Sequence, residues 1–225
     1  MVKYATALYS GGKDSTYSLH LAYLQSYVIK CLLVITPPKD SELYHTPYVN
    51  LTLLQADVLG LPFIRIEGDG MNALRRALTE LKKNYPEVKY IITGALRSDY
   101  QRMRFNFIAS EFNLKVISPL WRKNQEKYLR DVVRHGIRFT LTSISVKGLP
   151  PKYLGKIIDE KDVEEIIMLS KIHGFNPAFE GGEAETLVLD APLFRKRLVL
   201  EDYEVIREWE YVYRLLIKRI RVVEK

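Results

Sequence analysis

The stretch Ala5-Thr6-Ala7-Leu8-Tyr9-Ser10-Gly11-Gly12-Lys13-Asp14-Ser15 decides the fold of this chain. Its first five residues form an apolar run that predicts a β-strand, and residues 15–26 follow a helical pattern. The two glycines between them tolerate positive φ and let a ligand approach the backbone without meeting a Cβ atom. Because a helix N-terminus carries partial positive charge, we expect this turn to bind an anion such as pyrophosphate.

The six residues Ser10–Ser15 differ from the common phosphate-binding P-loop, since only two glycines precede Lys13 and Asp14 replaces a serine or threonine. A purely structural alternative is a tight strand–helix turn in which Asp14 or Ser15 caps the helix. The complete string after a strand-like run favours nucleotide binding. It resembles the PP-loop of the ATP pyrophosphatase superfamily, whose members cleave ATP between its α- and β-phosphates.

Composition and charge are those of a soluble globular protein. Of the 225 residues, 27% are charged and 47% hydrophobic, and no apolar stretch approaches the roughly 18 residues of a membrane span. Residues 1–120 hold 14 Lys and Arg against 10 Asp and Glu, and residues 121–225 hold 20 against 17. We interpret this evenly spread net charge of +7 as a solvated, ion-paired surface. Without a signal-peptide pattern, the expected location is the cytoplasm, with no membrane partner.

The first half alternates short β-rich runs with helical patterns, an order that predicts a parallel sheet covered on both faces. The predicted strands are 3–9, 31–36, 63–67, 90–93 and 116–118, and the predicted helices are 15–26, 48–59, 71–84 and 99–112. Ligands of such sheets bind beyond the carboxyl ends of the strands. Thr36 and Gly94 stand at two of these ends, so we expect both to contact the nucleotide beside Ser10–Ser15.

The second half has a different pattern, and we place a domain boundary near Trp121, which gives domains 1–120 and 121–225. Helical patterns cover 125–135 and 162–173, while 138–146 and 196–224 alternate as antiparallel strands with one wet face do. The predicted fold class is therefore α/β, with an N-terminal Rossmann-like, parallel-sheet nucleotide-binding domain and a smaller C-terminal α+β domain.

Three carboxylates, Glu180, Glu183 and Glu185, lie within six residues beside Gly181 and Gly182. Like charges so close together raise one another's pKa or recruit a cation. The functional interpretations are Mg²⁺ ligation, ammonium binding, or the positioning of a cationic substrate group. The structural alternative is a Gly-Gly turn with solvated glutamates before a strand.

Arginines gather at 97–104, where a predicted strand ends and a helix begins. Arg102 is the expected phosphate contact, because it lies on the helix face nearest the strand end. The alternative is a polar helix face, since Arg102 and Arg104 are two residues apart and do not share one face. His45 lies in the loop after the second strand, where it is a hydrogen-bonded loop residue or a contributor to closure over the substrate.

Together these segments resemble the diphthine–ammonia ligase family of N-type ATP pyrophosphatases over nearly the whole chain. The resemblance is carried, in chain order, by Ser10–Ser15, Tyr44–Thr46, Leu53–Ala56, Gly60–Pro62, Gly94–Ser98, Tyr100–Arg102, Pro119–Trp121, Leu154–Lys156, Glu180–Glu183 and Asp190–Phe194. The segment from Glu180–Glu183 through Asp190–Phe194 is the most specific, because PP-loop enzymes in general lack it. Ala95-Leu96 and Ala178-Phe179 depart from the family pattern without removing a charged group.

The resemblance implies an adenine nucleotide alpha hydrolase-like first domain and an AMP-forming ligase that makes a C–N bond. The substrate would be diphthine, a modified histidine of translation elongation factor 2. ATP would adenylate its carboxylate, and ammonia would displace AMP after pyrophosphate has left. Mg²⁺ would bridge the phosphates, which requires few protein ligands.

The same resemblance suggests roles for individual residues. Lys13 and the amides of Gly11 and Gly12 would hold the departing pyrophosphate, and Ser10 and Ser15 would add hydroxyl contacts. Asp14 would orient Mg²⁺ or the loop. The proximity of Glu180, Glu183 and Glu185 suggests that these carboxylates attract ammonium and accept its proton, with Glu183 and Glu185 as the catalytic candidates. The expected substrate contacts are His45, Tyr100, Arg104 and Glu180.

Two other functions remain open. A PP-loop enzyme that modifies tRNA predicts a basic arm or zinc-binding cysteine pairs, which this sequence lacks, so nucleic acid is not an expected partner. A non-catalytic ATP-binding module would bind ATP without releasing pyrophosphate. The single cysteine, Cys31, lies in an apolar run without an identifiable histidine partner, which favours free ammonium over a glutaminase as the nitrogen source. The sequence does not decide whether the protein forms a homodimer.

Overall fold

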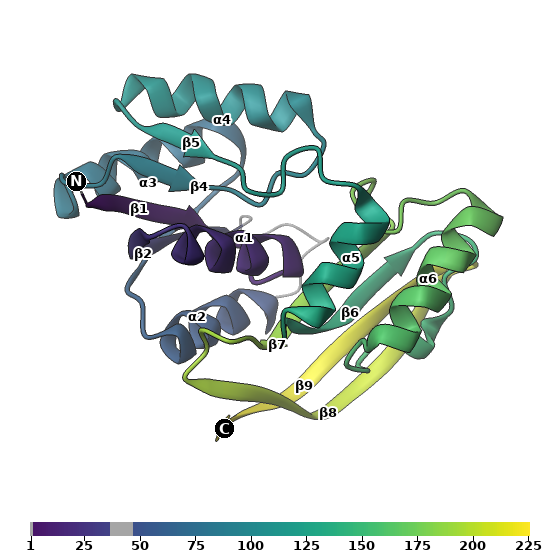
Figure 1. The fold of residues 1–225 in the computed structure, drawn as a ribbon. Coiled ribbons are helices and arrows are strands. Elements are labelled where there is room, and N and C mark those ends of the chain that lie inside the picture. Colours follow the sequence, from purple (N-terminus) through teal and green to yellow (C-terminus); the bar gives the residue numbers. More distant parts are fainter. Residues whose placement is uncertain (1, 37–46) are drawn as a thin grey trace. The chain divides into compact units, whose positions relative to one another are not determined.

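The computed structural model describes residues 2–36 and 47–225 of the chain. It forms two compact units, Met1–Trp121 and Arg122–Lys225, shown in Figure 1. The first unit thus ends one residue after the expected boundary. Within the described ranges, no helix is both long and apolar enough to cross a membrane.

The first unit is built on a five-stranded sheet in the order β3-β2-β1-β4-β5, and every strand pair is parallel. Figure 1 shows α1 and α2 on one side of this sheet and α3 and α4 on the other. The parallel, helix-covered sheet confirms the expected Rossmann-like α/β class. Its elements are β1 (Lys3–Leu8), α1 (Lys13–Leu24), β2 (Tyr27–Thr36), α2 (Pro47–Leu59), β3 (Phe63–Glu67), α3 (Gly70–Asn84), β4 (Tyr90–Ile92), α4 (Asp99–Glu111) and β5 (Lys115–Ile117).

One core of this unit lies between the sheet and helices α3 and α4. In α3 the buried side chains follow the spacing of one helix face, with Leu74, Ala77, Leu78 and Leu81 all less than 5% exposed. They pack with Cys31, Leu33 and Ile91 of the sheet and with Ile108 and Ala109 of α4. This packing fixes the strands whose carboxyl ends form the edge described below.

Two boundaries differ from expectation for identifiable reasons. Strand β2 begins at Tyr27 instead of residue 31, because Tyr27, Val28 and Ile29 pair in parallel with Lys3, Tyr4 and Ala5 of β1. Helix α1 begins at Lys13 instead of residue 15, directly after the second glycine of the loop. The helix N-terminus therefore lies closer to the glycines than the hydrophobic pattern indicated.

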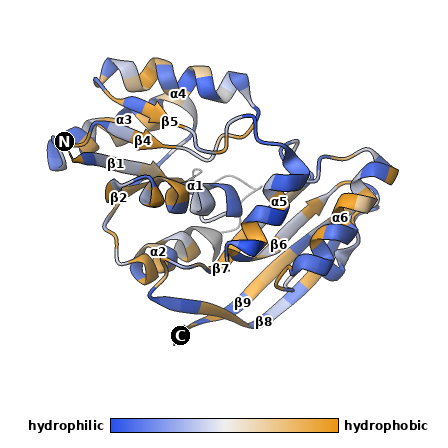
Figure 2. Cartoon of the chain, viewed as in Figure 1, coloured by the Kyte–Doolittle hydropathy of each residue, from blue (hydrophilic) through white to orange (hydrophobic). Residues whose placement is uncertain are grey.

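The second unit combines an antiparallel four-stranded sheet, in the order β7-β6-β9-β8, with two α-helices. Its elements are α5 (Gln125–Arg134), β6 (Arg138–Ser145), the short 3-10 helix η1 (Pro151–Tyr153), α6 (Glu160–His173), β7 (Ala184–Asp190), β8 (Lys196–Trp209) and β9 (Val212–Glu224). Helix α5 buries Tyr128, Leu129, Val132 and Val133, and its outer side is hydrophilic in Figure 2. This arrangement confirms the α+β prediction.

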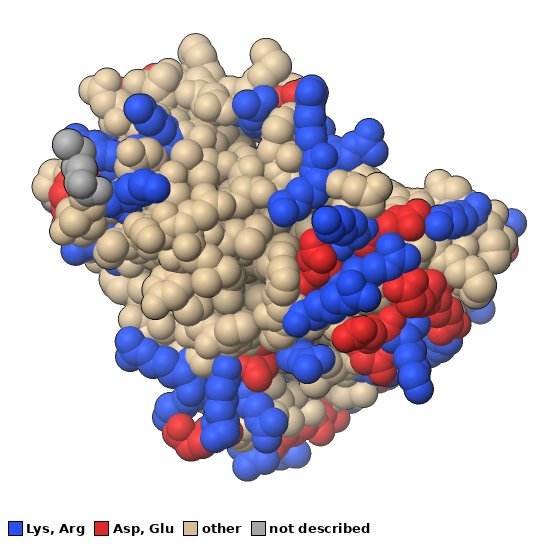
Figure 3. Space-filling model, viewed as in Figure 1, with Lys and Arg blue, Asp and Glu red and all other residues tan. Residues whose placement is uncertain are grey.

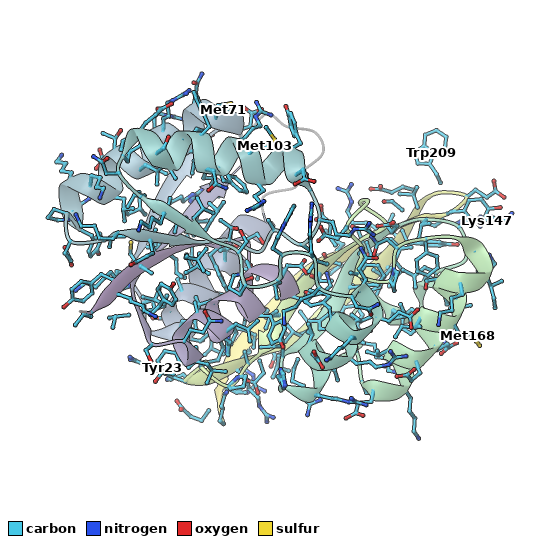
Figure 4. The ribbon with its side chains drawn as sticks, turned by 45° about the horizontal axis from the view of Figure 1, so that its top comes forward. Tyr23, Met71, Met103, Lys147, Met168 and Trp209 are labelled. Carbon is cyan, nitrogen blue, oxygen red and sulfur yellow. The ribbon has the colours of Figure 1, made fainter. Side chains whose placement is uncertain are left out.

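Strands β8 and β9 form a long hairpin whose outer part carries exposed side chains on β8. Trp209, at its turn, is 77% exposed and projects from the ribbon in Figure 4. The alternation of wet and dry faces expected over 196–224 is seen in β9 around Leu215 and Ile217, which are buried on either side of the half-buried Leu216. It is wrong for β8, where every side chain from Glu201 to Trp209 is exposed, because this part of the hairpin has no packed face.

The surface of α5 and α6 supports the interpretation of the net charge as ion-paired. Arg130 bonds the carboxylate of Glu164 through two nitrogens at 2.7 and 2.9 Å and lies 3.7 Å from Glu126. Lys171 reaches the same Glu126 at 3.0 Å. Figure 3 shows Lys and Arg interleaved with Asp and Glu over these two helices.

Candidate functional site at the carboxyl edge of the parallel sheet

The turn between β1 and α1 is anchored to the sheet on one side and to the helix on the other. The Tyr9 amide donates to the carbonyl of Leu33 in β2 at 2.9 Å. The Tyr9 hydroxyl lies 3.0 Å from Thr16 Oγ1 of α1. Tyr9 is 2% exposed, and burial raises the pKa of its phenol above the ordinary value, so the group stays protonated. The two ends of the glycine turn are therefore fixed.

Inside the turn, the two serines form a small hydrogen-bond network. The Ser10 amide donates to Ser15 Oγ at 3.3 Å, the two hydroxyl oxygens are 3.2 Å apart, and Ser15 Oγ donates to the Gly12 carbonyl at 3.1 Å. Both hydroxyls thus hold the loop in shape. Their predicted contact with phosphate stays a prediction.

Helix α1 begins without a side-chain cap, because its N-cap is Gly12. By contrast, Asn124 caps α5 and Asp159 caps α6 through side-chain oxygens. The N–H groups in the first turn of a helix have no partner inside the helix, and together with the helix dipole they attract anions. The start of α1 is therefore suited to a phosphate group.

Lys13 lies in the first turn of α1 and is almost completely buried, with 2% of its side chain exposed. Its Nζ is 3.0 Å from each carboxylate oxygen of Asp14, whose side chain is 30% exposed. A buried ammonium group needs such a partner, because an isolated charge is costly away from water. A cation held in this position can meet the charge of a bound phosphate.

The end of β4 presses against this turn. A Cβ atom built on Gly94 would lie 2.9 Å from the Ser15 nitrogen and 3.0 Å from the Asp14 carbonyl carbon. Chain connections diverge here, because β2 and β3 lie on one side of β1 and β4 and β5 on the other. Ligands of open α/β sheets bind at such a switch point. Gly94 thus lies where a nucleotide contact was expected.

Thr36 ends β2 on the same edge of the sheet and is 4% exposed. Its hydroxyl has no hydrogen-bond partner among the described residues. At the ends of β4 and β5, by contrast, the hydroxyls of Thr93 and Ser118 are 2.9 Å apart. The predicted contact of Thr36 with the nucleotide stays a prediction.

The sequence reasoning missed Gln55, a fully buried residue of α2. Its Nε2 donates to the carbonyl of Gly11 at 2.9 Å, across 44 residues of sequence. The signal available in the sequence was a polar residue within the apolar run Leu53-Leu54-Gln55-Ala56.

The arginines of α4 form local pairs with aromatic rings. The Arg102 guanidinium carbon lies 4.7 Å from the centre of the Trp121 ring, and Arg104 lies 4.7 Å from that of Tyr100, whose hydroxyl it also bonds. Arg102 and Tyr100 are exposed. Arg102 and Arg104 thus have different partners, and their contacts with nucleotide and substrate stay predictions.

In the second unit, Glu183 shapes the loop before β7. Its Oε1 accepts from the Asn176 amide at 3.0 Å, and its Oε2 accepts from the Gly181 amide at 2.8 Å. The same loop holds the buried Phe179 at a φ of 65°. Glu180 is half-buried and Glu185 is exposed on β7. Of the three glutamates, Glu183 therefore has a structural task in addition to any chemical one.

His45 lies outside the described residues. Within the described part of the chain, no three His, Cys, Asp or Glu side chains cluster as metal ligands. Asp14 is the carboxylate at the glycine turn, so a cation there would rely mainly on phosphate oxygens, as Mg²⁺ commonly does.

Cys31 is buried in the core of the first unit and bonds Thr6, whose Oγ1 lies 3.4 Å from its sulfur. Burial raises the pKa of the Cys31 thiol to about 11. A thiol that stays protonated at neutral pH is a poor nucleophile, which agrees with the expectation that it has no catalytic task.

Comparison with known proteins identifies both halves of the chain. The model of the diphthamide synthase N-terminal domain matches residues 3–116, and that of the diphthamide synthase C-terminal domain matches residues 124–223. Among solved structures, a tRNA thiolase of Methanococcus maripaludis overlaps with this chain at a TM-score of 0.38 and 16% identity, over 79% of this chain and 68% of its own.

The curated relatives include the human and fission yeast diphthine–ammonia ligases. The human protein is 34% identical over 89% of this chain and 84% of its own length. The Schizosaccharomyces pombe protein is 35% identical over 88% of this chain, which spans 36% of that longer protein. With both halves matched by the two domain models, the chain belongs to the diphthamide synthase family.

Proposed function

We propose that this protein is a diphthine–ammonia ligase, which uses ATP and ammonium to convert diphthine into diphthamide, the last step of diphthamide biosynthesis. The observation that carries the proposal is the start of α1, where the Gly12 N-cap, the buried Lys13 and the end of β4 meet at the switch point of the sheet. Family membership supports the choice of substrate.

The reaction has two steps. The diphthine carboxylate attacks the α-phosphorus of ATP, which forms an acyl-adenylate and breaks the bond to pyrophosphate. Ammonia then attacks the acyl carbon, AMP leaves with the electron pair of the broken C–O bond, and the added nitrogen loses one proton to give the amide. A carboxylate is a poor electrophile, so adenylation supplies the leaving group, and the protein contributes orientation and charge stabilisation.

The first unit would hold the nucleotide. The amides of the first turn of α1 would bind the β- and γ-phosphates, and Lys13 would neutralise charge that develops on the leaving pyrophosphate. Thr36 and Arg102 are proposed as further nucleotide contacts. Asp14 would orient the bound Mg²⁺, which neutralises phosphate charge when present.

The second unit would supply the acceptor for the ammonium proton. Glu185 suits this task, because its side chain is exposed, whereas both carboxylate oxygens of Glu183 accept backbone hydrogen bonds. Glu180, Tyr100, Arg104 and His45 are proposed to contact the substrate. Elongation factor 2 is the proposed diphthine-bearing partner, and the cytoplasm is the proposed location.

The test incubates the purified protein with diphthine-bearing elongation factor 2, ATP, Mg²⁺ and ammonium, and measures AMP, pyrophosphate and the amidated product. Lys13→Met keeps the buried aliphatic stem but removes the charge, and it should lower turnover about 100-fold or more. The matched control is Lys83→Met, since Lys83 is exposed at the end of α3 and should not affect turnover.

Release of ADP, or unaltered turnover in Lys13→Met, contradicts the proposal. ATP binding without AMP formation under any of these conditions points to the non-catalytic module. AMP formation that requires tRNA instead of elongation factor 2 points to the tRNA-modifying alternative.

A further inference from the structure

We infer that Gln55 is a positioning residue that locks the Gly11–Gly12 peptide in the orientation that binds pyrophosphate. The inference rests on the proposed function, because it concerns the same glycine turn. It assigns to α2 a part in phosphate binding that the sequence did not reveal.

The first step is the hydrogen bond itself. Gln55 Nε2 donates to the Gly11 carbonyl oxygen at 2.9 Å, and the Gln55 side chain is fully buried. A buried, well-formed hydrogen bond is costly to break when its groups are left without water, so it fixes the direction of that carbonyl.

The second step is peptide geometry. The Gly11 carbonyl and the Gly12 amide belong to one planar unit, and the described residues contain no cis peptide bond. In a trans peptide the C=O and N–H bonds point in opposite directions. Gln55 therefore turns the Gly12 N–H away from α2, and it fixes a donor beside the first turn of α1.

The third step is the reason that the Gly11–Gly12 peptide needs a contact to hold its orientation. Gly11 has a φ of 82°, and glycine moves between positive and negative φ with little steric resistance. Rotation of the Gly11–Gly12 peptide would present a carbonyl oxygen where a phosphate needs a donor. With two adjacent glycines, an external contact must hold the peptide, and Gln55 supplies it.

The side-chain amide of Gln55 also packs closely against Gly11. A Cβ atom on Gly11 would lie 2.2 Å from Gln55 Oε1 and 3.1 Å from its Cδ. The amide of Gln55 therefore fills the space beside Gly11, and a Cβ at position 11 would have to displace it, whereas the positive φ of Gly11 favours glycine independently.

The test compares three proteins by calorimetric titration with inorganic pyrophosphate and Mg²⁺. Gln55→Met keeps the length of the side chain but removes the donor, and it should weaken pyrophosphate binding about tenfold, or about 1.4 kcal/mol. The matched control is Thr52→Val, which removes another buried polar group from α2 and should bind as the wild type does.

Gln55→Glu provides a second readout that loss of packing would not produce. An ionised carboxylate beside the Gly11 carbonyl repels it, whereas a protonated one donates to it as the amide does. Pyrophosphate affinity relative to wild type should therefore rise as the pH falls from about 8 to about 5.5. Lys13 and Asp14 in the turn, His20 on α1 and Asp57 on α2 are the same in both proteins. The ratio at each pH therefore removes the pH dependence that variant and wild type share, including that of pyrophosphate.

Wild-type affinity in Gln55→Met, or a ratio for Gln55→Glu that does not change with pH, overturns the inference. If Gln55→Met fails to fold, the pH series on Gln55→Glu still decides it. Failure of the proposed function looks different, because the wild-type protein itself would then bind no pyrophosphate or release no AMP.

Discussion

Gly94→Ala adds a single methyl group where the end of β4 meets the phosphate-binding turn. Gly94 is not among the glycines with positive φ, so alanine meets no backbone strain there. The new Cβ would lie 2.9 Å from the Ser15 nitrogen and 3.0 Å from the Asp14 carbonyl carbon, whereas ordinary contact begins at 3.4 Å. Both atoms belong to the backbone, so no side-chain rotation relieves the contact.

The β4 end and the turn must therefore separate by about 0.5 Å, and overpacking of this kind costs about 1–3 kcal/mol of stability. A misplacement of about 1 Å can lower the rate of a positioned reaction about 100-fold, so half that distance predicts a loss of about tenfold in kcat/KM. The assay is AMP release at varied ATP, together with thermal unfolding.

The control is Gly70→Ala, in the same unit at the start of α3. A Cβ there has no neighbour within 4 Å, but the φ of 59° strains alanine. This variant should lose stability and keep its kcat/KM for ATP. Wild-type kcat/KM in Gly94→Ala would refute the reasoning, because the switch-point contact would then have no influence on the nucleotide.

Four further predictions concern single side chains. Cys31→Ser should leave ammonium-dependent turnover unchanged in the AMP assay, because a buried thiol with a pKa of about 11 supplies no thiolate; complete loss of turnover would contradict this. Glu183→Gln should lower the free energy of unfolding by about 1–3 kcal/mol in urea titrations. The Asn176 and Gly181 amides donate to different carboxylate oxygens, and in glutamine one of those two acceptors becomes an NH2 donor. Glu185→Gln should leave stability intact and reduce amide formation. If instead Glu183→Gln reduces amide formation and Glu185→Gln lowers stability, Glu183 is the proton acceptor and Glu185 the structural residue. The Asp162 amide lowers the pKa of the Asp159 carboxyl, so its contribution to stability is present above the ordinary carboxyl pKa and is lost as the pH falls through the lowered value. In Asp159→Asn the melting temperature should fall less between about pH 5 and pH 2 than in wild type. If the melting temperatures of the two proteins fall in parallel over this range, the Asp159 cap does not cause the loss of stability in acid.

The architecture was predictable from the sequence because it follows from local patterns. The β-α order of residues 3–118 predicted the parallel sheet, and the alternation in 196–224 predicted the antiparallel hairpin. The start of β2 at Tyr27 was not predictable in this way, because that segment is recruited by pairing with β1. The positions of Gly94 and Thr36 followed from the rule that parallel strands end at one edge.

Contacts between distant segments were beyond the reach of a single sequence. Gln55 touches Gly11 across 44 residues, and a polar residue in an apolar run does not by itself indicate its partner. Glu183 was predicted as a catalytic residue together with Glu185, because nothing in the sequence shows that its carboxylate accepts from two backbone amides. Side chains that act on the backbone of another segment carry no periodic signal.

The serine network of the glycine turn has a consequence for how the ligand arrives. Ser10, Ser15 and Gly12 already bond one another, and Tyr9 holds both ends of the turn. A phosphate chain thus meets a receptor that is folded beforehand, and little chain entropy is lost on association. Capture of the nucleotide should be rapid, and selectivity should reside in how slowly the correct anion departs.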